Sequence, residues 1–203
     1  MKIICIGFNY LNHAHELNNE VLTQPVFFLK PDTALLRNNN AFFIPDFSDE
    51  IHYEVELVLK INRLGKSIQQ KFANRYYNEI AVGIDFTARD IQKDCMAKGL
   101  PWEIAKGFDN SAAISNFISL EDLPDTENIQ FKLDLNGKTV QNGSSSKMIF
   151  DFDSIIAHTS KFMTLKTGDL IFTGTPENVG PVKIGDRLQA YIEDQLLLDF
   201  VIK

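Results

Sequence analysis

The amino-acid sequence predicts a single α+β domain over residues 1–203, with β-structure dominant. A chain of this length can bury one large core. Residues 51–61 alternate apolar and polar side chains, which is the period of a β-strand. From residue 129 onward, short strand-like runs alternate with turns. No internal repeat, linker or low-complexity segment divides the chain, so we expect one domain.

The composition argues against several classes of protein. Hydrophobic residues make up 44% and charged residues 23%, as is usual for a soluble globular chain. The net charge of −7 argues against a nucleic-acid or anionic-membrane partner, since either would require a basic surface. Two cysteines, Cys5 and Cys95, indicate a reducing compartment and no disulfide framework. We find no signal peptide or membrane-spanning run, and we therefore expect a cytoplasmic protein.

The N-terminal part contains a short apolar strand and a polar segment. Residues 2–7 form the apolar run, and residues 9–17 follow directly. If the second segment is helical, His13 and Glu16 share one face. A carboxylate beside an imidazole raises its basicity and fixes its tautomer, as a general base requires. The alternative is a solvated helix start with scattered polar residues.

A second apolar run, residues 25–31, predicts a buried strand that ends at Lys30 beside a proline. Three asparagines in residues 38–40 indicate a loop, and an apolar patch at residues 41–44 follows. Lys30 either forms a structural ion pair or contacts a ligand.

Residues 51–61 place Glu54 and Glu56 two positions apart, on the same face of the predicted strand. Adjacent carboxylates repel, and one of them would take up a proton in a desolvated place unless a cation held both. A hard divalent cation removes that conflict. The alternative is a half-exposed strand whose polar face happens to carry two glutamates.

The next segment brings a third carboxylate. Residues 65–78 carry apolar side chains at helical intervals and predict a surface helix. Residues 80–86 predict a strand that delivers Asp85 at its end. Arg89 and Gln92 follow at i and i+3, so they face the same way just beyond this carboxylate. A surface salt bridge is the alternative reading for the arginine.

The helix that contains Arg89 has recognisable ends. Thr87 and Asp90 have the spacing of a capping box at its start, and Gly99 with Pro101 closes it. Residues 100–109 then form a predicted loop that contains Lys106, which could place an ammonium over a site or be merely solvated.

The C-terminal half contains one helix among short strands. Asn136 and Gly137 predict a hairpin between residues 131–135 and 139–141. The remaining expected elements are a helix at 151–163, strands at 169–172, 187–192 and 196–202, and a Gly/Pro-bounded loop at 173–181. That loop lacks the Gly-Lys-Ser/Thr ending of a P-loop, so nucleotide binding is not expected.

Several of these segments together resemble the fumarylacetoacetate hydrolase (FAH) superfamily, and specifically its short, single-domain acylpyruvase branch. The matching segments occur in family order and cover nearly the whole chain; they are 7–10 with His13 and Glu16, 28–31, 52–57, 85–92, 98–102 with 105–106, 146–150, 173–176 and 180–182. One departure is Phe8, where many members carry arginine. It leaves open how the site entrance treats charged substrates.

This resemblance implies a rolled, mixed β-sheet with peripheral helices, usually found as a homodimer. It also implies a Mg²⁺ or Mn²⁺ site whose ligands match Glu54, Glu56 and Asp85. An all-oxygen ligand set favours Mg²⁺, Mn²⁺ or Ca²⁺ over zinc.

The resemblance also assigns roles to the other polar residues. The pair His13 and Glu16 would activate a water molecule, and Lys106 would stabilise oxyanion charge. Four further side chains would hold a small 2-keto acid substrate: Arg89, Gln92, Lys30 and Thr175.

The reaction expected from the resemblance is hydrolysis of an acylpyruvate to pyruvate and a carboxylic acid, with oxaloacetate decarboxylation or tautomerisation also open. One alternative is isomerisation or decarboxylation of dienedioates such as 2-hydroxyhepta-2,4-diene-1,7-dioate. A catalytically silent metal-binding scaffold is the alternative from a different class.

Overall fold

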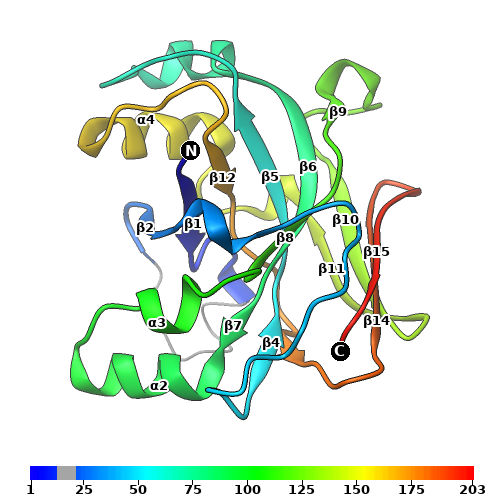
Figure 1. Cartoon of the computed structure of the whole chain (residues 1–203). Coiled ribbons are helices and arrows are strands. Elements are labelled where there is room, and N and C mark those ends of the chain that lie inside the picture. The colour runs from blue at the N-terminus through cyan, green and yellow to red at the C-terminus, as the bar shows by residue number, and fades with distance from the viewer. Residues whose placement is uncertain (13–21) are drawn as a thin grey trace.

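The structure is a computed structural model that describes residues 1–12 and 22–203 (Figure 1). Its main sheet has eight strands in the order β2-β1-β12-β5-β6-β8-β3, with β9 also paired to β6. The sheet is mixed, because β1 is parallel to β12 and β3 is parallel to β8 while the other pairs are antiparallel. The strands are β1 (Ile3–Gly7), β2 (Val26–Lys30), β3 (Leu35–Leu36), β5 (Val55–Ile61), β6 (Tyr77–Asp85), β8 (Ala112–Ile114), β9 (Ile118–Ser119) and β12 (Leu170–Phe172).

Two smaller sheets complete the β-structure of the described residues. The four-stranded sheet has the order β11-β10-β14-β15 and lies on the right in Figure 1. Its strands are β10 (Gln130–Leu135), β11 (Lys138–Ser144), β14 (Arg187–Ile192) and β15 (Gln195–Val201). The three-stranded sheet, β13-β4-β7, is formed by β4 (Ile51–Tyr53), β7 (Thr87–Ala88) and β13 (Gly180–Pro181). The predicted hairpin is confirmed: Asn136 and Gly137 have φ of 53° and 78°, as a type I′ turn requires.

The helices lie at the periphery (Figure 1). Those that lie wholly among the described residues are α2 (Arg89–Lys98), α3 (Glu103–Lys106) and α4 (Phe152–Phe162), with 3-10 turns η1 (Asp32–Ala34), η2 (Gln70–Arg75), η3 (Leu120–Asp122) and η4 (Ser145–Lys147). The predicted helix at 151–163 is thus confirmed as α4, and the side chain of Asp151 caps it by accepting from Ser154 N at 2.7 Å. The predicted fold class, α+β with β dominant, is confirmed.

The main core lies between the long strands β5 and β6 and the four-stranded sheet. Leu57 and Val82 contribute from the first side and Leu133 and Phe200 from the second, all of them buried. A second apolar cluster, which includes Val58 and Phe172, covers the opposite face of β5. Both faces of this central strand are therefore buried.

The single strand predicted at 51–61 is wrong in two respects. The chain leaves one sheet and enters another at Glu54, so that β4 and β5 are separate strands. The face expected to be polar is also buried: Glu56 is 2% exposed and Val58 is fully buried. The physical reason is that β5 has a strand on each side and an apolar cluster on each face.

The surface helix predicted at 65–78 is reduced to the 3-10 turn η2. The backbone N–H groups of Ser67 and Ile68 donate instead to Ser160, through its carbonyl and its hydroxyl respectively. These bonds tie the segment to α4, and β6 begins only two residues after the turn ends. Tertiary contacts have therefore overridden the local periodicity.

Three smaller expectations also need correction. Ala88 rather than Thr87 is the N-cap of α2, and Asp90 bonds to Ser48 Oγ at 2.6 Å instead of closing a capping box. The strand expected to be buried at 25–31 is partly exposed except at Pro25 and Lys30. The loop expected at 100–109 contains the short helix α3.

Candidate metal and substrate site

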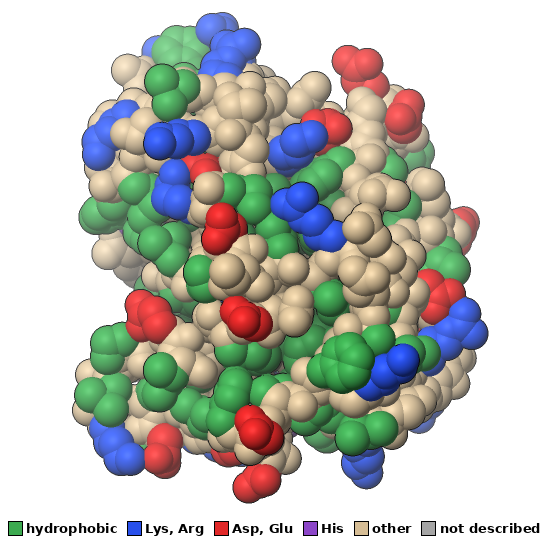
Figure 2. All heavy atoms as spheres, in the orientation of Figure 1, with side chains coloured by type: hydrophobic (Ala, Val, Ile, Leu, Met, Phe, Trp, Pro, Cys, Tyr) green, Lys and Arg blue, Asp and Glu red, His purple; other side chains and the backbone are tan. Residues whose placement is uncertain are grey.

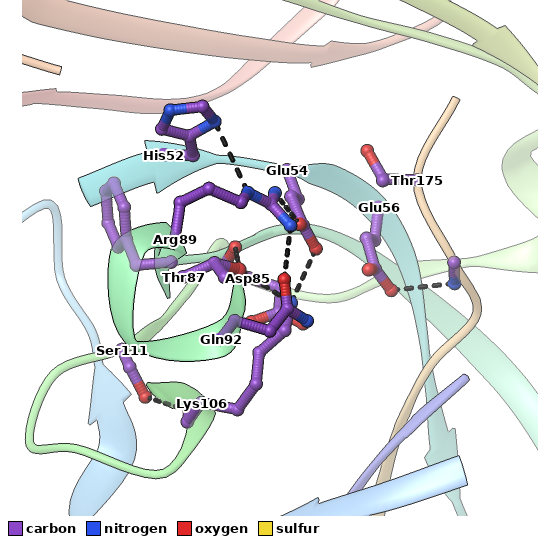
Figure 3. A network of polar contacts seen from close by, with 12 residues as sticks. His52, Glu54, Glu56, Asp85, Thr87, Arg89, Gln92, Lys106, Ser111 and Thr175 are labelled. Carbon is purple, nitrogen blue, oxygen red and sulfur yellow. Dashed lines mark hydrogen bonds and ion pairs between the residues drawn. The ribbon is translucent and has the colours of Figure 1, made fainter. Parts of the chain in front are cut away.

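Three carboxylates meet where β4, β5 and β6 converge (Figure 3). Glu54 lies at the break between β4 and β5, Glu56 lies in β5, and Asp85 is the last residue of β6. The antiparallel register pairs Val55 with Ile84, which aligns this end of β6 with the glutamates. One oxygen from each carboxylate lies within 4.8 Å of the other two. The structure therefore brings together the three residues that the sequence predicted as ligands.

The cluster is buried, and its carboxylates carry charges of the same sign. The exposed fractions are 5% for Glu54, 2% for Glu56 and 1% for Asp85. Burial raises the pKa of Glu56 well above its usual range, and the charges of the other two carboxylates raise that pKa further. A hydrogen bond from the Gly174 N–H opposes the shift but does not cancel it.

This arrangement fits a divalent cation. The donors are all carboxylate oxygens, which are the ligands that Mg²⁺ and Mn²⁺ prefer. Among the described residues, Asp85 Oδ1 accepts no hydrogen bond, although Lys30 Nζ lies 2.7 Å away as an ion pair.

Lys106, the last residue of α3, is a buried cation beside the cluster. Its Nζ lies 2.8 Å from Glu54 Oε2, 3.0 Å from Asp85 Oδ2 and 2.6 Å from Thr87 Oγ1. Burial alone would lower the pKa of Lys106, but the two carboxylates outweigh burial and raise it. The side chain therefore keeps its positive charge, as a group that stabilises an oxyanion must.

Arg89 and Gln92 extend from the first turn of α2 toward the same cluster (Figure 3). The guanidinium of Arg89 forms an ion pair with Glu54 and donates to Gln92 Oε1 at 2.5 Å. Its Nε also contacts His52 Nδ1 at 3.4 Å. The prediction that Arg89 and Gln92 face the same way is thus confirmed, and both side chains face the carboxylate cluster.

The loop after β12 provides the opposite wall. The N–H of Gly174 donates to Glu56 Oε2 at 2.7 Å, and Thr175 follows in the cavity lining. Gly174 has φ of 103°, and a Cβ there would lie 2.7 Å from the Cβ of Asn9. Only glycine fits this close approach without a shift. Asn9 in turn holds the loop, because its Nδ2 donates to Thr173 O at 2.8 Å.

These residues surround a small cavity with one polar and one aromatic side. The polar side consists of the three carboxylates with Arg89, Gln92, Lys106 and Thr175. The aromatic side consists of Phe8, Phe28 and Trp102. The Phe8 and Trp102 rings meet edge to face, with centroids 5.9 Å apart. Phe8 also has φ of 58°, a rare conformation for a bulky residue and one that accumulates at functional sites.

Lys30 lies behind the cluster and does not line the cavity. Besides Asp85, its Nζ contacts the carbonyl oxygens of Phe86, Lys106 and Ser111. The described contacts favour a role in holding Asp85 and the neighbouring backbone. Substrate binding by Lys30 stays a prediction. His13 and Glu16 lie outside the described residues, so their predicted role also stays a prediction.

A larger cavity is present elsewhere, between η2, β6, η3, η4 and α4. Its lining includes Glu121, Glu127, Asp151 and Asp153 but no lysine or arginine of the described chain. The hydroxyl of Tyr77 donates to Asp153 there at 3.0 Å. We place the functional site at the smaller cavity, because its lining contains buried carboxylates and buried cations together.

Comparison with known proteins gives a consistent family match. The family model Fumarylacetoacetate (FAA) hydrolase C-terminal matches residues 2–199. Oxaloacetate tautomerase FAHD1, mitochondrial, from Mus musculus is 40% identical over 202 residues, which cover 100% of this chain and 91% of that protein. Oxaloacetate decarboxylase, mitochondrial, from Dictyostelium discoideum is 42% identical over 192 residues, covering 94% and 88%.

A solved structure agrees with the sequence matches. Fumarylpyruvate hydrolase from Pseudomonas aeruginosa, in complex with Mn²⁺ and pyruvate, superposes with a TM-score of 0.93 at 32% identity, covering 100% of this chain and 90% of that one. The expected FAH-type mixed sheet is therefore confirmed. The expected cytoplasmic location is contradicted, because the relatives from Mus musculus and Dictyostelium discoideum are both named as mitochondrial.

Proposed function

Because the chain belongs to the fumarylacetoacetate hydrolase family, we propose that it is a divalent-cation-dependent enzyme acting on 2-oxo acids through their enols. Keto–enol tautomerisation or decarboxylation of oxaloacetate is the first candidate reaction. Hydrolysis of an acylpyruvate to pyruvate and a carboxylic acid is the second. The observation that supports the proposal most is the convergence of Glu54, Glu56 and Asp85 with two cationic side chains at one cavity.

The ligand set defines where a substrate would sit. Glu54, Glu56 and Asp85 would hold Mg²⁺ or Mn²⁺, and such a cation supplies Lewis-acid stabilisation of the negative charge on an enolate oxygen. Burial and the charges of Asp85 and Glu54 disfavour the ionised form of Glu56, and this is the reason to expect a cation at this place.

The chain's own side chains would bind and stabilise the substrate. Lys106 stays positively charged, so it can stabilise charge that develops on a substrate oxygen. The guanidinium of Arg89 and the amide of Gln92 have donors for a substrate carboxylate. Thr175 presents a hydroxyl from the opposite wall. Tautomerisation then requires only a base that moves a proton between carbon 3 and the enol oxygen.

Hydrolysis requires an additional step, in which a water molecule attacks the distal carbonyl and the bond between carbons 3 and 4 breaks. His13 with Glu16 is the candidate to take the proton from this water, after which carbon 3 is protonated to give pyruvate. This second candidate is favoured by the presence of both residues in the sequence and by the structural similarity to a fumarylpyruvate hydrolase.

Replacement of His13 by alanine separates the two reactions. Loss of a general base costs roughly 10²–10⁴-fold, so acetylpyruvate hydrolysis should collapse to that extent. Oxaloacetate decarboxylation, which needs no activated water, should largely persist. Both rates are followed with metal-stripped protein after Mg²⁺ or Mn²⁺ is added back. His15→Ala is the matched control, since no role is assigned to that histidine.

The outcomes distinguish the alternatives. Equal retention of both activities in the His13→Ala protein would contradict the role assigned to His13. If the parent protein turned over neither substrate with either metal, the proposed function itself would be wrong.

A further inference from the structure

Gln141 is a buried polar residue on β11 that lies outside the cavity wall. It is 1% exposed and pairs with Leu133 of β10 in the four-stranded sheet. Its carboxamide reaches out of this sheet and contacts two segments that carry the site: the start of β5 and the loop after β12. One side chain therefore joins parts of the chain that are far apart in the sequence.

The contacts use both ends of the amide. Gln141 Oε1 accepts a hydrogen bond from Val55 N at 2.9 Å. Gln141 Nε2 donates to Thr175 Oγ1 at 3.0 Å and to Pro176 O at 2.9 Å. The N–H of Val55 can only donate and the carbonyl of Pro176 can only accept, so the orientation of the amide is determined by its partners.

The first contact lies within the ligand segment. Val55 stands between Glu54 and Glu56, at the point where β4 ends and β5 begins. A hydrogen bond to its N–H fixes the Glu54–Val55 peptide, and with it the direction in which each glutamate leaves the backbone.

The second contact determines what Thr175 can offer a substrate. A hydroxyl has one hydrogen to donate and two lone pairs that accept. Because Thr175 Oγ1 accepts from Gln141, its own hydrogen is left to donate. A donor is what a negatively charged substrate oxygen requires.

We propose that Gln141 is a positioning residue: it holds the Thr175 hydroxyl at a fixed place relative to the Glu54–Val55 peptide and orients it as a donor to an anionic oxygen of the bound 2-oxo acid. The identity of the ligand rests on the proposed function, whereas the link between the two segments does not.

The binding test uses Mn²⁺-loaded protein and oxalate, a stable dianion that resembles the enolate of a 2-oxo acid. Calorimetry compares the parent with Gln141→Met, Thr175→Val and the double variant. Each single change should weaken oxalate binding by about tenfold, the value of one hydrogen bond. If Gln141 acts through Thr175, the double variant should be no more than about twofold weaker than Thr175→Val alone. The KM for oxaloacetate should rise in parallel, with a smaller change in kcat.

Gln189→Met is the matched control. Gln189 lies on β14 of the same sheet, and the one described hydrogen bond of its side chain is to Asp199. This variant should bind oxalate like the parent. The proposal would be overturned if Gln141→Met bound oxalate as tightly as the parent. It would also be overturned if the losses of oxalate affinity in the two single variants multiplied fully in the double variant.

A second measurement needs neither metal nor substrate. In metal-free protein, hydrogen exchange of the Val55 amide, followed by NMR, should be at least about tenfold faster in Gln141→Met than in the parent. The rates are compared with those of β14 amides, which report global opening. An unchanged Val55 rate would contradict the structural link. If the parent bound no Mn²⁺ or oxalate, the proposed function would fail, and this exchange rate alone would decide on Gln141.

Discussion

Lys30 is a buried ammonium whose surroundings are determined by the fold. Its side chain is fully buried, and its partners are Asp85, three backbone carbonyls and the Ser111 hydroxyl. Replacement by methionine would leave Asp85 Oδ1 without its ion pair and the carbonyls without their donor. We expect Lys30→Met to lower the free energy of unfolding by about 3–5 kcal/mol, the cost of removing one partner of a buried pair. Urea denaturation followed by circular dichroism measures this.

Lys60→Met is the matched control. Lys60 pairs with Glu79 at 2.6 Å, but both side chains are more than one-third exposed. Solvent screens such a pair, so its loss should change the free energy of unfolding by less than about 1 kcal/mol. Equal effects of the two substitutions would show that Lys30 is not a structural ion pair.

At this scale the sequence predicted the residue types of the site better than their contacts. The two-residue spacing of Glu54 and Glu56 was sufficient to predict that their carboxylates lie together, although the chain changes sheets at Glu54, and the end of a predicted strand was sufficient to deliver Asp85. The carbonyl partners of Lys30 could not be found, because every residue has a carbonyl and nothing in the sequence marks the ones that converge. Gln141 was missed for a similar reason: its partners are mostly backbone groups of distant segments.

At the scale of elements, Asp169 joins the beginnings of two parallel strands, β1 and β12. Its carboxylate accepts from Lys2 N at 2.8 Å, from the Lys2 ammonium, and from Lys166 N at 2.8 Å. Burial alone would raise the pKa of Asp169, but these donors outweigh burial and hold the pKa below its usual range. The ionised form therefore stabilises the folded protein.

The sign of this shift gives a pH dependence. A carboxyl whose folded pKa is depressed contributes stability that is complete above its unfolded pKa, about 3.9, and is lost as the pH falls through the folded value. We expect Asp169→Asn to be destabilised by about 1–3 kcal/mol at pH 7, with the difference from the parent shrinking below about pH 4. Denaturant midpoints measured from pH 3 to pH 7 test this.

Asp199→Asn is the control for an exposed pair. Asp199 bonds to Arg187, whose side chain is 57% exposed. Loss of this pair should therefore lower the free energy of unfolding by less than Asp169→Asn does. A gap between Asp169→Asn and the parent that stayed constant down to pH 3 would contradict the account of Asp169.

Elements were predictable where local chemistry determines them. The Asn136–Gly137 turn and the helix expected at 151–163 each depend on residues close in the sequence, and both were correctly predicted. The helix at 65–78 was wrong because Ser160, about 90 residues away, takes up its backbone donors. The break at Glu54 was also missed, since alternation continues through it while the chain changes sheets.

At the scale of the whole molecule, the site depends on chain segments that are widely separated. Lys106 and Thr175 come from a short helix and a loop on different sides of the carboxylate cluster (Figure 3). Charged side chains of both signs are dispersed over the face in Figure 2, with no continuous basic surface there. No helix among the described residues is long and apolar enough to cross a membrane.

The family resemblance also predicts the state of assembly. We expect a homodimer, with a mass of about twice 23.0 kDa in sedimentation-equilibrium experiments. Exposed apolar side chains on α2 and α3 and in the loop between them, such as Met96, Leu100 and Ile104, are available for contacts. Weak dimers have dissociation constants of about 1 μM. If the protein remained a single species at the mass of one chain at concentrations up to about that value, this expectation would be contradicted.

We propose that Glu54, Glu56 and Asp85 bind a catalytic divalent cation. The most direct test is a calorimetric titration of metal-free protein with Mn²⁺. It compares the parent with Glu56→Gln and with the surface control Glu79→Gln. We predict one site per chain in the parent and the surface variant, and binding weaker by about a hundredfold or more in Glu56→Gln, because affinity follows ligand charge. Equal Mn²⁺ affinity in all three proteins, or none in the parent, would contradict the claim.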